Sequence, residues 1–293
     1  MPTLSADLSS ISSRGQSYAD FFKLPLAHQV WRGQVGDFQG SGIGSSLDFQ
    51  DHRSYMPGDD PRHINWQAFA RTGQYSMKLY REEVRPLVDV VLDVSESMKI
   101  DDDKWKRALE LFYFCIHAAL KAGASLSTSV VKGENHIHFR NDMIHNPQWI
   151  EQAEQLPATS AACPPELQSV PLRAQSMRIF ISDLLFHDSP QTTLVALARE
   201  QGRAMLMAPF CVSEERPDWE GNYEFVEIED SSIHPHRIER HLLERYHDTY
   251  HRHFDLWKSL ATKHGALMAR VPAEPDFQSS LQYEALAAKV IEF

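Results

Sequence analysis

The stretch Leu87-Val88-Asp89-Val90-Val91-Leu92-Asp93-Val94-Ser95-Glu96-Ser97-Met98 decides the fold. Apart from Asp89, residues 87–92 are aliphatic, and three of the six are β-branched valines, which is typical of a strand buried on both faces of a parallel sheet. After Asp93 the sequence becomes polar, which indicates a loop. The stretch therefore predicts a central strand whose carboxyl end carries Asp93, Ser95 and Ser97.

The segments that follow alternate between helix and strand patterns. Apolar residues from Trp105 to Leu120 recur at helical spacing, which indicates an amphipathic helix. Residues 177–183 form a second apolar strand that also ends in an acid, Asp183. Further helix and strand patterns alternate to the end of the chain. This alternation predicts an α/β fold with a mostly parallel sheet flanked by helices.

The carboxylates and hydroxyls after these strands form a candidate metal site. In open α/β sheets, ligands gather at the carboxyl ends of the strands. Asp93, Ser95 and Ser97 alternate along the chain and can point the same way, and Asp183 ends a second strand. Such hard oxygen ligands suit Mg²⁺ or Mn²⁺. The sequence therefore predicts a divalent cation at this edge of the sheet.

The composition of the chain indicates which kinds of partner and which cellular compartment to expect. The chain of 293 residues has a formal net charge of −11, so binding to nucleic acid would need a local basic patch, and none stands out. We expect no membrane span, because no apolar run approaches the ~20 residues required. No secretory signal is evident at the N-terminus. Three widely spaced cysteines are typical of reduced, mostly buried thiols, and we expect the protein in the cytoplasm.

Three regions are predicted along the chain. Residues 1–20 are polar and rich in serine, so we expect a flexible N-terminal arm. Residues 21–86 contain short β-like runs separated by glycines, which indicates a small β-rich lobe. Residues 87–293 form the α/β domain.

The polar residues of the α/β domain resemble the metal-ion-dependent adhesion site of von Willebrand factor A domains. That pattern is DxSxS, then a lone Thr, then an Asp after a later strand. Asp93, Ser95, Ser97 and Asp183 match the first and last parts. The resemblance implies Thr159 as the middle ligand, with the adjacent Ser160 as the alternative.

The lobe carries a second, longer pattern, Arg53-Ser54-Tyr55-Met56-Pro57-Gly58-Asp59-Asp60-Pro61-Arg62-His63-Ile64-Asn65-Trp66. It resembles the signature of a prokaryotic family catalogued as domain of unknown function 58. The matching positions are Arg53, Tyr55, Gly58, Asp59, Asp60, Arg62, Trp66 and Arg71. Members are commonly found beside MoxR-type AAA+ ATPases, so the resemblance implies such an ATPase as partner. We expect the charged members to form a hydrogen-bonded cluster that fixes the lobe on the sheet.

We therefore expect a metal-dependent protein-binding adaptor that is not an enzyme. No GxSxG elbow and no phosphate-binding loop is present. His247 and His251 lie four residues apart, but no third zinc ligand is obvious. Two alternatives stay open: a metallohydrolase using the same Asp and Ser cluster, for which Glu96 is the only nearby base, and a metal-free scaffold.

Overall fold

The computed structural model describes residues 4–26, 35–43, 49–140, 146, 148–157, 163–226 and 233–293. The chain divides into two compact units, one formed by residues 1–25 and 87–293 and the other by residues 26–86. The lobe predicted over residues 21–86 thus begins slightly later, because Phe22 and Leu24 are buried within the larger unit and Lys23 pairs with Glu292.

The larger unit is built around a six-stranded sheet with strand order β11-β8-β7-β4-β5-β6. Its strands are β4 (Leu87–Asp93), β5 (Ser125–Lys132), β6 (Asn135–Phe139), β7 (Met177–Ile181), β8 (Arg203–Phe210) and β11 (Leu267–Pro272). All neighbouring pairs are parallel except β5 and β6, which form an antiparallel hairpin at one edge. The predicted α/β fold with a mostly parallel sheet is therefore confirmed.

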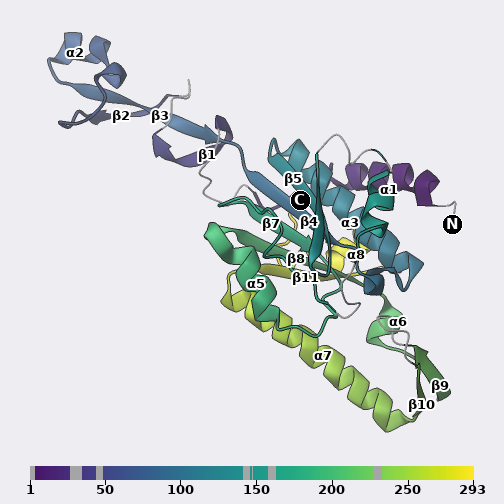
Figure 1. Ribbon diagram of the computed structural model, residues 1–293. Coiled ribbons are helices and arrows are strands. Elements are labelled where there is room, and N and C mark those ends of the chain that lie inside the picture. The colour runs from purple at the N-terminus through teal and green to yellow at the C-terminus, as the bar shows by residue number, and fades with distance from the viewer. Residues whose placement is uncertain are drawn as a thin grey trace. The chain divides into compact units, whose positions relative to one another are not determined.

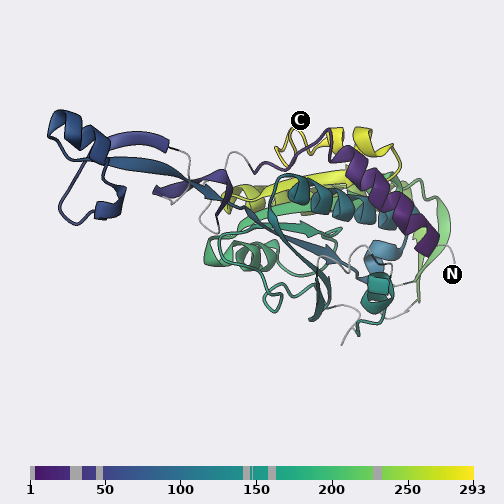
Figure 2. The ribbon, with the colours of Figure 1, turned by 90° about the horizontal axis from the view of Figure 1, so that it is seen from above.

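Helices cover both faces of this sheet (Figures 1 and 2). They are α1 (Leu4–Tyr18), α3 (Asp102–Lys121), α4 (Gln148–Glu154), α5 (Pro190–Ala198), α6 (Val212–Glu215), α7 (Arg240–Lys263) and α8 (Phe277–Tyr283), with 3₁₀ turns η2 (Glu96–Lys99) and η3 (Arg199–Gln201). On one face Val91, Phe180 and Leu206 share a buried core with Leu194 of α5 and Trp257 of α7. Because strand side chains alternate between faces, their neighbours in β4, β7 and β8 face the side that α3 covers.

Helix α1 replaces the flexible arm predicted over residues 1–20, so that prediction is wrong. Leu8 and Ile11 are buried, and Gly15 lies so close to α3 that a Cβ there would be 2.8 Å from the backbone nitrogen of Phe114. Two well-spaced apolar residues and one glycine are enough to pack this Ser-rich helix. Because the helix as a whole is polar, its sequence pattern does not reveal the few apolar residues that become buried.

A two-stranded hairpin extends from the larger unit between α6 and α7. It consists of β9 (Gly221–Val226) and β10 (Ile233–Ile238), paired antiparallel. The sequence pattern predicts a strand over residues 223–228 and a long helix from residue 236 to about residue 264. In the structure α7 begins at Arg240, since residues 233–238 pair with β9 instead.

The smaller unit is an antiparallel sheet of strand order β1-β3-β2 with a short helix. Its elements are β1 (Val35–Ile43), β2 (Phe49–Ser54), η1 (Pro61–His63), α2 (Trp66–Thr72) and β3 (Ser76–Val84). Asn65 caps α2 by accepting the N–H of Ala68. Gly58 has a φ of 107° in the turn after β2, a conformation that favours glycine. The β-rich character predicted for this region is confirmed.

Candidate functional site

The polar cluster lies where the strand order of the sheet reverses. The chain runs from β4 outward to β5 and then returns to β7 on the other side of β4. Leu92 pairs with Ile181 in the register of β4 and β7, so Asp93 and Ser182 leave the sheet at nearly the same level. The carboxyl ends of such diverging strands are the usual ligand site of an open α/β sheet.

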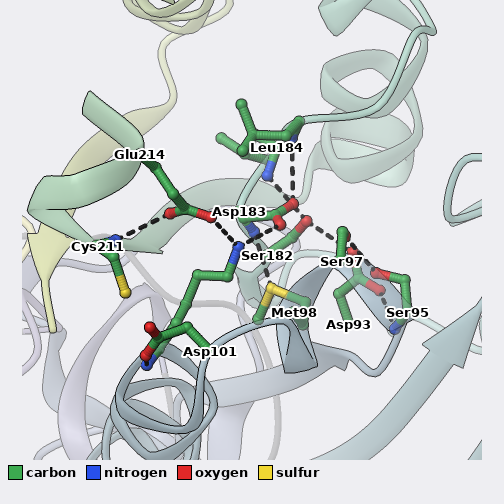
Figure 3. Close-up of polar contacts among 12 residues, drawn as sticks. Asp93, Ser95, Ser97, Met98, Asp101, Ser182, Asp183, Leu184, Cys211 and Glu214 are labelled. Carbon is green, nitrogen blue, oxygen red and sulfur yellow. Dashed lines mark hydrogen bonds and ion pairs between the residues drawn. The ribbon is translucent and has the colours of Figure 1, made fainter. Parts of the chain in front are cut away.

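Asp93 is a buried carboxylate held by hydrogen bonds (Figure 3). Its Oδ1 accepts the N–H of Ser95 at 2.9 Å and its Oδ2 accepts the hydroxyl of Ser182 at 2.7 Å. Burial, and then the negative charge of Asp183, raise the pKa of Asp93 to about 6. Among the described residues, Asp93 has no cationic partner. A cation placed here would relieve the cost of burying this charge.

Ser95 and Ser97 form the more accessible side of the cluster. Their hydroxyl oxygens lie 3.1 Å apart, and both residues are half-buried whereas Asp93 is buried. Glu96, between them, points elsewhere: its carboxylate pairs with Lys132 of β5 at 2.6 Å. The two serines therefore present neighbouring oxygens towards solvent, and Glu96 is occupied as an ion-pair partner.

Asp183 sits on a turn with an unusual backbone. Its Oδ1 accepts the N–H of Leu185 at 3.1 Å, and its own N–H points at the sulfur of Met98. Leu184 has a φ of 58°, a conformation that costs a non-glycine residue energy. Its carbonyl oxygen lies 2.7 Å from Nε2 of His253 on α7. Helix α7 thus holds the turn that carries Asp183.

A buried lysine joins this turn to a third strand end. The ammonium of Lys104, on the first turn of α3, is fully buried and lies 3.1 Å from Asp183 Oδ2 and 2.5 Å from Glu214 Oε1. Glu214, on α6 after β8, also accepts the N–H of Cys211. Burial lowers the pKa of Lys104, but the charges of Asp183 and Glu214 outweigh it, so the pKa is raised. Lys104 is therefore a permanent cation between two carboxylates.

The donor set suits a hard divalent cation. The buried carboxylates of Asp93 and Asp183 lie beside the hydroxyl oxygens of Ser95 and Ser97, and Glu214 is held in its ion pair with Lys104. Within the described ranges no group of three or more His, Cys, Asp or Glu side chains is arranged to hold a metal, so any cation here would depend on serine hydroxyls and water. This chemistry favours Mg²⁺ or Mn²⁺ over Zn²⁺.

The structure brings together four of the five predicted ligands. Asp93, Ser95, Ser97 and Asp183 lie in one network through Ser182 and Met98. Thr159 and its alternative Ser160 fall outside the described residues. The three cysteines are free, with Cys115 and Cys211 buried and Cys163 half-buried, as predicted.

The signature residues of the lobe form local pairs. Arg53 donates two hydrogen bonds to Asp59, at 2.7 and 2.6 Å, and Arg62 pairs with Asp60 at 2.6 Å. These pairs close turns within the smaller unit, so these four signature residues form two local pairs where the sequence predicts one cluster. The fixing of the lobe on the sheet stays a prediction. Tyr55, Trp66 and the neighbouring aromatic residues pack around Tyr75.

The family model described as "Protein of unknown function DUF58" matches residues 51–252, which is more than half of the chain. The chain belongs to the DUF58 family. The match begins in the lobe signature and runs through Asp93, Lys104, Asp183 and Glu214. The resemblance found in the sequence is thereby confirmed at the level of the family.

Solved structures similar to this DUF58 protein come from two Bacteroides species. One is an aerotolerance-related membrane protein from Bacteroides fragilis with multiple mutations to serines, 12% identical with a TM-score of 0.36, covering 70% of this chain and 98% of the other. Another is the conserved hypothetical protein BatB from Bacteroides thetaiotaomicron, 12% identical with a TM-score of 0.33, covering 69% and 98%. No curated protein matches the chain. None of the helices that the structure describes combines the length and the apolar character needed to cross a membrane.

Two members of the network were missed in the sequence. Lys104 lies among charged residues at the start of a helix, where a lysine is ordinarily solvated. Glu214 lies on a four-residue helix without a strong pattern. One signal was available: Lys104 directly precedes Trp105, the first apolar residue of the helical stripe, and so lies near the face that packs on the sheet.

Proposed function

We propose that this DUF58 protein is a non-enzymatic adaptor that binds a partner protein through a divalent cation. Asp93, Ser95, Ser97 and Asp183 would hold Mg²⁺ or Mn²⁺ directly or through water, with Thr159 or Ser160 completing the set. The observation that carries the proposal is the meeting of two buried carboxylates and two half-buried hydroxyls at the strand-order reversal.

The chemistry of the partner follows from the accessible side of the cluster. Mg²⁺ keeps several waters when it binds few protein ligands, and one water can be replaced by an Asp or Glu side chain. Ser95 and Ser97 are the members of the cluster that reach solvent. A carboxylate arriving beside them would gain a contact with the cation that exists only when the metal is bound.

The family resemblance supplies the candidate partner, a MoxR-type AAA+ ATPase. In this proposal the ATPase supplies ATP hydrolysis, and the adaptor couples it to a client during complex assembly or protein maturation. We place this activity in the cytoplasm, where such an ATPase finds its ATP. The three free thiols are in keeping with a reducing compartment.

A metallohydrolase built on the same cluster would need a general base beside the cation. Glu96 is the base that the sequence offers, and its carboxylate pairs with Lys132. The geometry therefore favours binding over hydrolysis. Turnover of phosphoesters or peptides that requires Mg²⁺ and is lost in Asp93→Ala would overturn the adaptor proposal.

The first experiment is a pull-down with the full chain as bait and the co-expressed ATPase as prey. Wild type, Asp93→Ala and a control, Asp102→Ala, are each assayed with Mg²⁺ and with EDTA. Asp102 is an exposed acid on the first turn of α3, so it matches the charge change without touching the cluster.

The proposal expects retention by wild type and Asp102→Ala only with Mg²⁺, and by Asp93→Ala in neither condition. Retention in every lane would instead indicate a metal-free scaffold. Isothermal titration of MgCl₂ into the same proteins tests cation binding separately from partner binding.

A further inference from the structure

An apolar groove lies between the β9–β10 hairpin and the first turns of α7. Its volume is about 420 Å³, within the range of pockets that bind ligands. The apolar lining is formed by Trp219, Phe225, Leu242, Leu243 and Tyr246. This groove belongs to neither the predicted cation site nor the lobe signature.

The aromatic side chains on the two sides of the groove contact one another. The ring of Trp219 packs against those of Phe225 and Tyr246 at centroid distances of 5.2 and 5.6 Å. The hydroxyl of Tyr246 donates to the carbonyl oxygen of Glu214 at 2.7 Å. Because these contacts fix both walls, an occupant would meet a largely formed surface.

Apolar surface continues beyond the groove along the hairpin. Tyr223 is 38% exposed and stacks on Phe225. Because side chains alternate between the two faces of a strand, the exposed Val226 and Ile233 lie on the opposite face of the hairpin and are not part of this surface. An exposed aromatic side chain that extends an apolar groove in this way is more typical of a contact with a protein segment than of a small-molecule site.

The charge around the groove favours an acidic occupant. Apart from the phenol of Tyr246, the ionisable side chains that line it are Arg245 and His236, both basic, in a chain whose net charge is −11. Neighbouring Arg240 is paired with Glu244 at 3.1 Å. In the part of the chain that the structure describes, Arg245 has no acidic partner. Its guanidinium is therefore available to a carboxylate.

We propose that this groove docks a segment of a partner protein that carries a large apolar side chain beside an Asp or Glu. The apolar side chain fills the space against Trp219 and Tyr246, and the carboxylate pairs with Arg245. This site is separate from the cation cluster and needs no metal, so its failure and that of the adaptor proposal are distinguishable.

The test begins with the full chain on an array of octapeptides in which the two central residues are varied over all types. Leu, Phe or Trp next to Glu or Asp should give the strongest signals. The best such peptide is then labelled with fluorescein, and its affinity is measured by anisotropy beside the same peptide with Lys in place of the acid. The Lys peptide should bind at least about tenfold more weakly, since like charges would meet at Arg245.

Substitutions in the protein test whether the peptide binds in the groove. Arg245→Glu should weaken binding of the acidic peptide about tenfold or more, whereas Arg252→Glu, an equal charge change on the exposed surface of α7 outside the groove, should stay within about twofold. Affinity should be the same with Mg²⁺, with EDTA and in Asp93→Ala. No acidic preference on the array, an unchanged affinity in Arg245→Glu, or a requirement for Mg²⁺ would each overturn the proposal.

Discussion

Two groups of charged side chains in this protein differ in how far apart their members lie along the chain. In the larger unit, Lys104 contacts Asp183 and Glu214 across separations of 79 and 110 residues, and its side chain is fully buried. In the smaller unit, Arg62 pairs with Asp60 two residues away, and its side chain is 86% exposed. The first group joins the ends of several core elements, whereas the second shapes one turn.

This difference shows which charged side chains contribute to the stability of the folded state. A buried ammonium is tolerated only when carboxylates surround it, and each carboxylate in turn depends on the ammonium. An exposed pair is solvated in either state and contributes little. The long-range group therefore couples the turn that carries Asp183 to the stability of the whole unit, and the local pairs do not.

The largest expected effect is that of Lys104→Met. The substitution keeps an apolar stem but leaves the buried Asp183 and the half-buried Glu214 without their cation, so the free energy of unfolding should fall by about 3–5 kcal/mol. Urea denaturation at pH 7, followed by the fluorescence of the buried Trp149 and Trp257, reports this unit. Arg62→Met is the matched control and should leave the midpoint unchanged. Equal effects of the two substitutions would contradict the distinction between the groups.

The titration of Asp93 should make the free energy of unfolding depend on pH, with a change similar in size to that expected for Lys104→Met. Its pKa is about 6 when folded and 3.8 ordinarily, so between these values the unfolded chain loses its proton first. Without divalent cations, stability should therefore fall as the pH rises from about 4 to about 6, by on the order of 3 kcal/mol.

Asp93→Asn should lack this fall, because it carries no proton to lose. The measurement is the difference between the urea midpoints of wild type and Asp93→Asn from pH 4 to pH 7 in EDTA. A difference that does not vary with pH would show that the carboxylate is not desolvated as described.

Divalent cations should stabilise the larger unit by a slightly smaller amount. Saturation to about 100 times the dissociation constant contributes about 2.7 kcal/mol to a folded state that alone binds the ligand. Thermal unfolding of wild type with rising MgCl₂ should show a steady increase in Tm that Asp93→Ala abolishes. An identical shift in both proteins would indicate a general salt effect.

The smallest effect is expected at the exposed pair of the lobe. Hydrogen bonds from Arg62 lower the pKa of Asp60 to about 2, so the stabilisation that the pair provides is present above pH 4 and lost as the pH falls through about 2. Asp60→Asn should differ from wild type only slightly at neutral pH. Near-UV circular dichroism, which detects the packing of Trp66 against Tyr75, should show the two proteins to be alike at pH 7.

Sequence patterns identify those parts of the site that lie on strongly periodic elements. β4 and β7 are apolar runs with an acid at the end, so Asp93 and Asp183 could be placed at one edge of a parallel sheet. Lys104 and Glu214 could not, because their burial depends on which face of α3 meets the sheet and on the path of the chain after β8. Helix α1 was missed for a similar reason, since Gly15 matters only once α3 lies against it.

The left-handed conformation of Leu184 has a consequence for how fast the site can respond. Leu184 is completely buried, its N–H donates to the hydroxyl of Ser182, and its carbonyl oxygen is held by His253. Relaxing this turn would require an apolar side chain to leave the core and a contact with α7 to break. At the proposed cation site Asp183 would therefore be preorganised, so little conformational entropy would be lost on binding. Exchange of ligands at this edge should then be governed by dehydration of the ion and not by folding of the loop.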